Sequence, residues 1–208
     1  MKKMSNPKLM SIFIGVIFVA LLLPGAGPAA SPEVAPQATP PTATVVDTKG
    51  KSYNVADLKA KYTYFGTFFF TAGQPKRITE SLIIVFVFVE DRVSITEELD
   101  VPFASMRSVV FKEASVPEKF KEMFNKKKPI RIEMRDDSVV LLSDDLLVKI
   151  DAKGNQTRTV NIREYRFVTA SGGQEIFLDG FSGRAKTASG KEGDFWVPLS
   201  ETRSIEFK

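Results

Sequence analysis

Acidic side chains that could act as paired catalytic carboxylates occur next to each other at four places in the 208-residue chain. A glycosidase needs two carboxyl groups that face each other across the bond to be cleaved. Neighbouring residues of a strand point to opposite faces, so adjacency in sequence does not create such a pair. Most of the pairs fall at predicted turns, where Asp is favoured because it hydrogen-bonds nearby backbone. The pairs are Glu90-Asp91, Glu97-Glu98, Asp136-Asp137 and Asp144-Asp145.

Calcium is a second chemistry that clustered carboxylates could support. Asp136, Asp137, Asp144 and Asp145 would converge if their hairpin were tight, and Ca²⁺ takes six to eight oxygen ligands. However, the chain has no D-x-D-x-D-G loop, and Lys153 stands where a ligand would be needed in the segment 151–155. We therefore expect no metal and no cofactor.

Other chemistries are excluded by composition, because the chain has no Cys and no His. A disulfide framework, a thiolate or imidazole zinc site, a Cys nucleophile and a Ser-His-Asp triad are all impossible. The glycines at 172–173, 180 and 183 are isolated and indicate turns rather than a phosphate-binding loop. We expect a protein that is not an enzyme.

The N-terminus has the order of a secretory signal peptide. Lys2, Lys3 and Lys8 precede an apolar run at 9–23, and small residues follow to a predicted cleavage after Ala29. The alternative is a retained membrane anchor, but a spanning helix needs roughly 20 apolar residues and this run is shorter. The sequence thus predicts a signal helix at 1–29, export to the periplasm or outside the cell, and membrane contact through this segment alone.

Residues 30–44 are rich in Pro, Ala and Thr, and we expect an extended linker there. The net charge is +4, but residues 1–30 carry three lysines and no acidic residue. Without them, 26 basic residues face 25 acidic ones. Such a balance, with no clustered basic footprint, does not predict nucleic-acid binding.

Three segments of the remaining chain share a spacing: 101–109, 160–168 and 197–205. In each, Val and a large apolar residue lie two apart, Arg follows four residues later, and another apolar strand former comes two after that. Alternation of this kind predicts a strand, one turn of 3₁₀-helix and a second strand, with Pro102 and Pro198 on edge strands or beside a bulge. Corners of this type close small SH3-like barrels.

The fold class we expect is therefore all-β, with two related barrel-like or sheet modules at 45–112 and 130–208. Further strands are expected on either side of turns at Lys49-Gly50, Asp136-Asp137 and 151–155. One short linking helix is predicted at 113–129. Ser115 and Glu118 form a capping-box pattern there, and Phe120, Met123 and Phe124 would share one face.

Candidate contact residues come from three features. The run Leu82 to Val89 does not alternate, so both of its faces must be covered, either by the chain itself or by a partner at Phe86 and Phe88. Trp196, the only Trp, could stack on a sugar or anchor a partner if it is exposed. Lys126, Lys127 and Lys128 form either a solvated helix end or a contact for an anionic envelope polymer or lipid surface.

The segments "VPFASMRSVVF" and "FWVPLSETRSIEF", together with "VDTKGKSYNVADL", resemble a class of exported bacterial β modules of uncharacterised function that end in V-P-L-x-x-I-x-S-I-x-F. Met106 and Thr202 stand where that class usually has Ile. The resemblance implies an envelope setting and a small β fold, and it carries no catalytic residues.

These observations favour a non-enzymatic, exported binding or structural protein of the cell envelope. Its partner would be an envelope protein, an anionic envelope polymer or a second copy of the chain. One alternative is a carboxylate-dependent polysaccharide hydrolase. The other is a carrier of a small apolar ligand, with a cavity around Phe68, Phe70, Phe86 and Phe88.

Overall fold

A computed structural model describes residues 42–64, 76–125, 127–171, 173–186 and 190–208. These residues form an antiparallel β fold with one short α-helix, which confirms the predicted all-β class. No helix in the described ranges is both long and apolar enough to cross a membrane. The predicted signal segment, with Ala29, and nearly all of the predicted linker lie outside these ranges.

Strands occupy most of the described chain, and each pairs antiparallel with its neighbours. Their bounds are β1 Ala43–Asp47, β2 Ser52–Thr63, β3 Lys76–Thr79, β4 Ser81–Glu90, β5 Val93–Pro102, β6 Met106–Val110, β7 Ile130–Met134, β8 Val139–Leu142, β9 Leu146–Ile150, β10 Gln156–Arg166, β11 Val168–Ser171, β12 Gln174–Lys186, β13 Glu192–Pro198 and β14 Thr202–Phe207.

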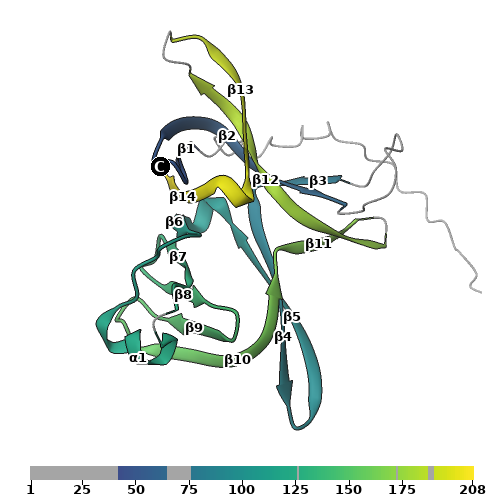
Figure 1. Cartoon of the computed structure of the whole chain (residues 1–208), viewed down its shortest axis with the longest axis vertical. Helices are drawn as coiled ribbons and strands as arrows, with labels where there is room; N and C mark the ends of the chain where they lie inside the picture. Colours follow the sequence, from purple (N-terminus) through teal and green to yellow (C-terminus); the bar gives the residue numbers. More distant parts are fainter. Residues whose placement is uncertain (1–41, 65–75, 126, 172, 187–189) are drawn as a thin grey trace, which may run out of the picture. The chain divides into compact units, whose positions relative to one another are not determined.

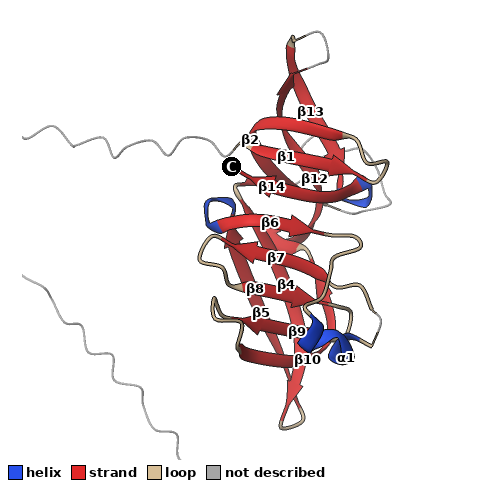
Figure 2. Ribbon diagram, turned by 90° about the vertical axis from the view of Figure 1, so that its left-hand side faces the viewer, coloured by secondary structure: helices blue, strands red, loops and turns tan. Residues whose placement is uncertain are grey.

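The strand order is β11-β12-β2-β1-β14-β6-β7-β8-β9-β10-β4-β5, with β13 paired to β12 and β3 paired to β2 (Figure 1). The order differs from the chain order because distant segments pair: β2 lies against β12 and β4 lies against β10. Strands on the two sides of the segment 113–129 therefore belong to one sheet. Figure 2 shows β1, β14, β6 and β7 side by side.

Two of the three repeated segments form the predicted corner. The strand β5 ends at Pro102, the 3₁₀-helix η1 covers Phe103–Ser105, and β6 follows. The strand β13 ends at Pro198, the 3₁₀-helix η3 covers Leu199–Glu201, and β14 follows. In the described residues, β5 pairs with β4 alone and β13 with β12 alone, so both prolines do lie on edge strands, where a missing N–H is tolerated.

The two corners meet at equivalent positions. Val109 of β6 is opposite Ile205 of β14, and both are buried. These two residues hold the same place in the two copies of the repeat, 96 positions apart along the chain. Antiparallel pairing of equivalent residues relates the two strands by a local twofold axis.

The prediction of a corner at 160–168 was wrong. This segment continues as extended strand β10 and then begins β11. It has no proline, and its residues are held in ladders along their length, first with β9 and then with β4. A 3₁₀ turn within this segment would interrupt these ladders, so the segment stays extended.

The linking helix is shorter than predicted. A 3₁₀ turn at Glu118–Phe120, η2, leads into α1 at Lys121–Phe124, and Asn125 ends it with a left-handed φ of 41°. The predicted capping by Ser115 was wrong, because Pro117 precedes the turn and the Ser115 hydroxyl instead accepts a hydrogen bond from Arg131.

The apolar face of this helix was predicted only in part. Phe120 and Phe124 are buried together with Leu141 of β8 and Val148 of β9. Met123, which was expected on the same face, is 40% exposed. A helix this short buries two of the three apolar side chains.

The hairpin turns follow the prediction. Gly50, with φ of 82°, lies between β1 and β2, and Asp137, with φ of 67°, lies between β7 and β8. The turn at 151–155 joins β9 to β10 through a bond from the Asn155 amide to the Asp151 carboxylate. Asp and Asn at these positions stabilise the turn backbone.

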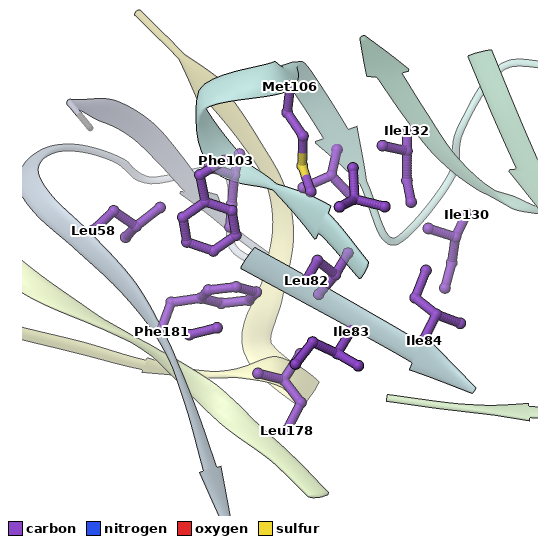
Figure 3. Close-up of a cluster of buried hydrophobic side chains, with 14 of the residues drawn as sticks. Leu58, Leu82, Ile83, Ile84, Phe103, Met106, Ile130, Ile132, Leu178 and Phe181 are labelled. Atoms are coloured by element: carbon purple, nitrogen blue, oxygen red, sulfur yellow. The ribbon is translucent and has the colours of Figure 1, made fainter. Parts of the chain in front are cut away.

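The core surrounds the first half of β4 (Figure 3). Leu82, Ile83 and Ile84 are fully buried although they point to alternate faces, so the chain covers both faces there. The buried Tyr62 hydroxyl accepts a 2.8 Å bond from the Ile83 amide, and burial raises the pKa of Tyr62. Near the β4–β5 turn the chain no longer covers both faces of β4, and Val89 there is 39% exposed.

Candidate functional site

The two phenylalanines predicted as partner contacts have different environments. Phe86 is fully buried in the core, so its ring is not available to a partner. Phe88 is half-buried and stacks on Phe86 at 6.1 Å between ring centroids. The Arg158 guanidinium lies 5.9 Å from the Phe88 ring centroid, and its two NH groups bind both oxygens of Glu97 at 2.5 and 2.6 Å. This end of β4 is thus covered by an ion pair of the chain itself.

Trp196 is exposed at 44%, on the edge strand β13. The Lys61 ammonium lies 4.8 Å from its ring centroid, a cation–π distance. Ser182 is its cross-strand partner, and Gly180 of β12 lies so close that an added Cβ would be 2.8 Å from the indole. The indole therefore packs beside Gly180 of β12 and Lys61 of β2.

The predicted lysine cluster is largely neutralised. Lys127 pairs with Asp145 at 2.6 Å, and Lys128 lies 3.8 Å from Glu113. Lys126 lies outside the described residues. The two described ammonium groups face carboxylates of the same chain.

Several members of the acidic pairs stabilise turns or form ion pairs. Asp136 accepts bonds from the Ser138 hydroxyl and amide, which lower its pKa. Asp137 pairs with Arg107 at 2.6 Å, and Lys127 and Ser143 lower the pKa of Asp145. Within the described ranges, no group of three or more His, Cys, Asp or Glu residues could hold a metal ion.

An open depression of about 600 Å³ lies elsewhere, where four segments meet. The second half of β10 supplies four of its nine lining residues, and the others come from Phe167, β12, η3 and the β8–β9 turn. The lining residues are Asp144, Arg163, Glu164, Tyr165, Arg166, Phe167, Phe177, Leu178 and Leu199. Apolar side chains and four charged side chains thus meet on one open surface.

Two charged side chains of the depression have no partner among the described residues. Arg163 and Asp144 are both exposed and make no side-chain hydrogen bond or ion pair there. Arg166, in contrast, binds Glu175 at 3.0 Å and lies 3.8 Å from Glu164. The depression thus presents one available guanidinium and one available carboxylate.

Tyr165 connects the depression to the core. Its ring packs edge-on against Phe167 at 5.8 Å, and Phe167 packs in the same way against Phe111 at 5.9 Å. Burial, followed by the negative charge of Asp144, raises the pKa of Tyr165. The phenol is therefore protonated at neutral pH and can donate a hydrogen bond.

A change of partner along β10 places Arg163. The strand pairs with β9 up to Asn161 and with β4 from Ile162, and the register shifts between Ile162 and Glu164. Arg163 lies in this β-bulge, and bulges redirect side chains beside functional sites. The Ile162 amide bonds to the Asp145 carbonyl at 3.0 Å, which fixes the β8–β9 turn with Asp144 next to the bulge.

Sequence reasoning missed this site. The segment 160–168 was interpreted as a corner, and no pattern showed that residues 144, 163, 177 and 199 come together. The cavity predicted around four phenylalanines differs from it: Phe86 is in the core, and Phe68 and Phe70 lie outside the described residues. One signal in the sequence is the run of four polar or charged residues at 163–166, which interrupts the alternation of apolar and polar residues expected of a strand.

No protein-family model matches the chain, and no significant similarity to a curated protein or to a solved structure is found. The site must therefore be interpreted from its own geometry.

Proposed function

We propose that this protein is a non-enzymatic, exported binding protein of a bacterial-type cell envelope, and that it binds its ligand in the depression beside β10. The main support for this proposal comes from Arg163 and Asp144. Neither side chain has a partner among the described residues, and both line the depression together with half-buried aromatic rings. Charged side chains on a folded surface gain most from a partner where the surface is concave and partly apolar.

The signal-like order of residues 1–29 and the Pro-rich segment after it support export to the periplasm or beyond. The linker would separate the folded part from the signal segment. An envelope protein, an envelope polymer and a second copy of the chain remain the partner classes that fit this location.

We further propose that the strands form two related barrel-like modules, one inserted into the other. One module would contain β1, β2, β12, β13 and β14, and the other β4 to β10. In each, an edge strand leads through a 3₁₀ turn to the strand at the opposite end of its group. The local twofold relation of Val109 and Ile205 supports a common origin of the two corners.

A polysaccharide hydrolase is the weaker alternative. Its general acid needs a carboxyl group with a raised pKa. The described carboxyl groups whose pKa departs from the ordinary value are all lowered, by hydrogen bonds or ion pairs. A carrier of an apolar ligand fits less well too, because the depression is open and bordered by charges.

Photo-crosslinking in cells tests the proposal. The full chain is expressed in an exporting bacterium with a photoreactive amino acid at position 163, and with the same amino acid at position 184 as a control. Arg184 is a matched site, because it too is an exposed strand arginine without a described partner. We expect the protein in the envelope fraction and an adduct from position 163 alone; equal adducts at both positions, or none, would contradict the proposal.

A further inference from the structure

We infer that the ligand of the depression is a neutral, hydroxyl-rich sugar ring. This inference rests on the proposed binding function and specifies its ligand. Three features of the depression support it: its balance of charges, its aromatic lining and its size.

The charges of the depression cancel. The side chains without a described partner are one guanidinium, Arg163, and one carboxylate, Asp144, while Arg166 lies 3.8 Å from Glu164. Neither an anionic nor a cationic ligand would therefore meet a surplus of opposite charge. A hydroxyl group suits both kinds of side chain, because it accepts a hydrogen bond from a guanidinium and donates one to a carboxylate. Neighbouring hydroxyls on a sugar ring can do both at the same time.

The lining also fits the apolar faces of a sugar. Tyr165, Phe167 and Phe177 contribute rings and Leu178 and Leu199 contribute aliphatic surface. The C–H groups of a pyranose carry partial positive charge, and the faces of aromatic rings are negative. The protonated Tyr165 hydroxyl adds a donor and acceptor beside the rings.

The volume of about 600 Å³ falls within the range of roughly 300–1,000 Å³ that ligand sites occupy. Because the depression is open, a sugar within a chain could enter without its ends being enclosed. An oligosaccharide is therefore a better probe than a monosaccharide.

Calorimetric titration of the purified full chain tests the inference. The neutral probes are the tetrasaccharides of β-1,4-linked glucose, α-1,4-linked glucose and β-1,4-linked N-acetylglucosamine; the anionic probe is tetragalacturonate. We expect at least one neutral probe to bind with a Kd of about 10 µM to 1 mM, and more tightly than the anionic probe.

Two substitutions of opposite charge distinguish sugar recognition from anion binding. For a neutral sugar, Arg163→Ala and Asp144→Asn each weaken binding about tenfold, because each removes a charge-assisted hydrogen bond. At an anion site, Asp144→Asn would instead strengthen binding, since it removes a repelling charge. Arg184→Ala is the control, with no expected change, and circular dichroism verifies that each variant is folded.

The outcomes separate the sugar from the binding function itself. If position 163 crosslinks in cells but no neutral probe binds, the sugar assignment is overturned and the binding function stands. Preference for tetragalacturonate, or tighter binding by Asp144→Asn, overturns the sugar assignment as well. Loss of both crosslinking and sugar binding contradicts the proposed function.

Discussion

Truncation of Phe103, the first residue of the corner between β5 and β6, should strongly destabilise the fold. The side chain is 1% exposed, and its ring lies 4.9 Å from that of Phe207 and 6.5 Å from that of Phe181. A buried Phe→Ala change costs about 3–5 kcal/mol, because it removes apolar contacts and leaves a cavity. Leu199 holds the equivalent place in the other corner but is half-buried, so Leu199→Ala should cost only about 1 kcal/mol.

Urea denaturation followed by far-UV circular dichroism and by Trp196 fluorescence measures both free energies of unfolding. Coincident transitions from the two probes would establish the two-state behaviour that such a comparison needs. The variant Phe103→Leu, which keeps most of the volume, should recover most of the loss. A cost for Phe103→Ala below about 1 kcal/mol, or below that of Leu199→Ala, would refute the view that this corner anchors the core.

Other substitutions test the sheet and its charges. Gly180→Ala should destabilise by about 1–3 kcal/mol in a urea titration, because the new Cβ would clash with the Val197 carbonyl oxygen. Gly193→Ala, with open space around it, is the control and should be nearly neutral. A double-mutant cycle of Glu97→Gln and Arg158→Gln should give a coupling free energy of about 0.5–1 kcal/mol, since both side chains are about one-third exposed; zero coupling would contradict the bidentate geometry. Carboxyl groups whose pKa is lowered in the folded protein stabilise it at pH values above their ordinary pKa, which is near 4. The free energy of unfolding should therefore fall as the pH decreases below that value. Arg158→Gln should make this decline shallower, because it returns the pKa of Glu97 toward its ordinary value.

The local elements of the fold could be predicted from sequence, because their causes are local. Alternating Val-x-apolar residues around a proline determine a strand that ends in a turn, and Gly50 provides the positive φ of a hairpin. The sheet order could not be predicted. Pairing of β2 with β12 joins residues more than one hundred positions apart, and no pattern in a single sequence selects that partner over another strand of similar apolar character.

The predicted contact residues were chosen by residue type, and burial depends on neighbours that type does not reveal. Phe86 and Phe88 are two residues apart on one strand, yet the first is fully buried and the second is half-buried beside an ion pair. Trp196 could contact a partner only if it were exposed, and it is 44% exposed. Lys127 and Lys128 form a cluster in sequence, but Asp145 and Glu113 reach them from other segments.

The candidate site lies where the repeat departs from its pattern. In the first and third copies, Pro102 and Pro198 end a strand, and the next residues form a 3₁₀ turn. The second copy keeps the apolar spacing but has no proline, and its residues remain extended and bulge at Arg163. A turn in this place would coil the residues that now line the depression, whereas a strand with a bulge directs both Arg163 and Tyr165 toward it. The same spacing that builds a corner in two places is thus compatible with a binding surface in the third, and the missing proline is one of the sequence differences that accompany the two outcomes.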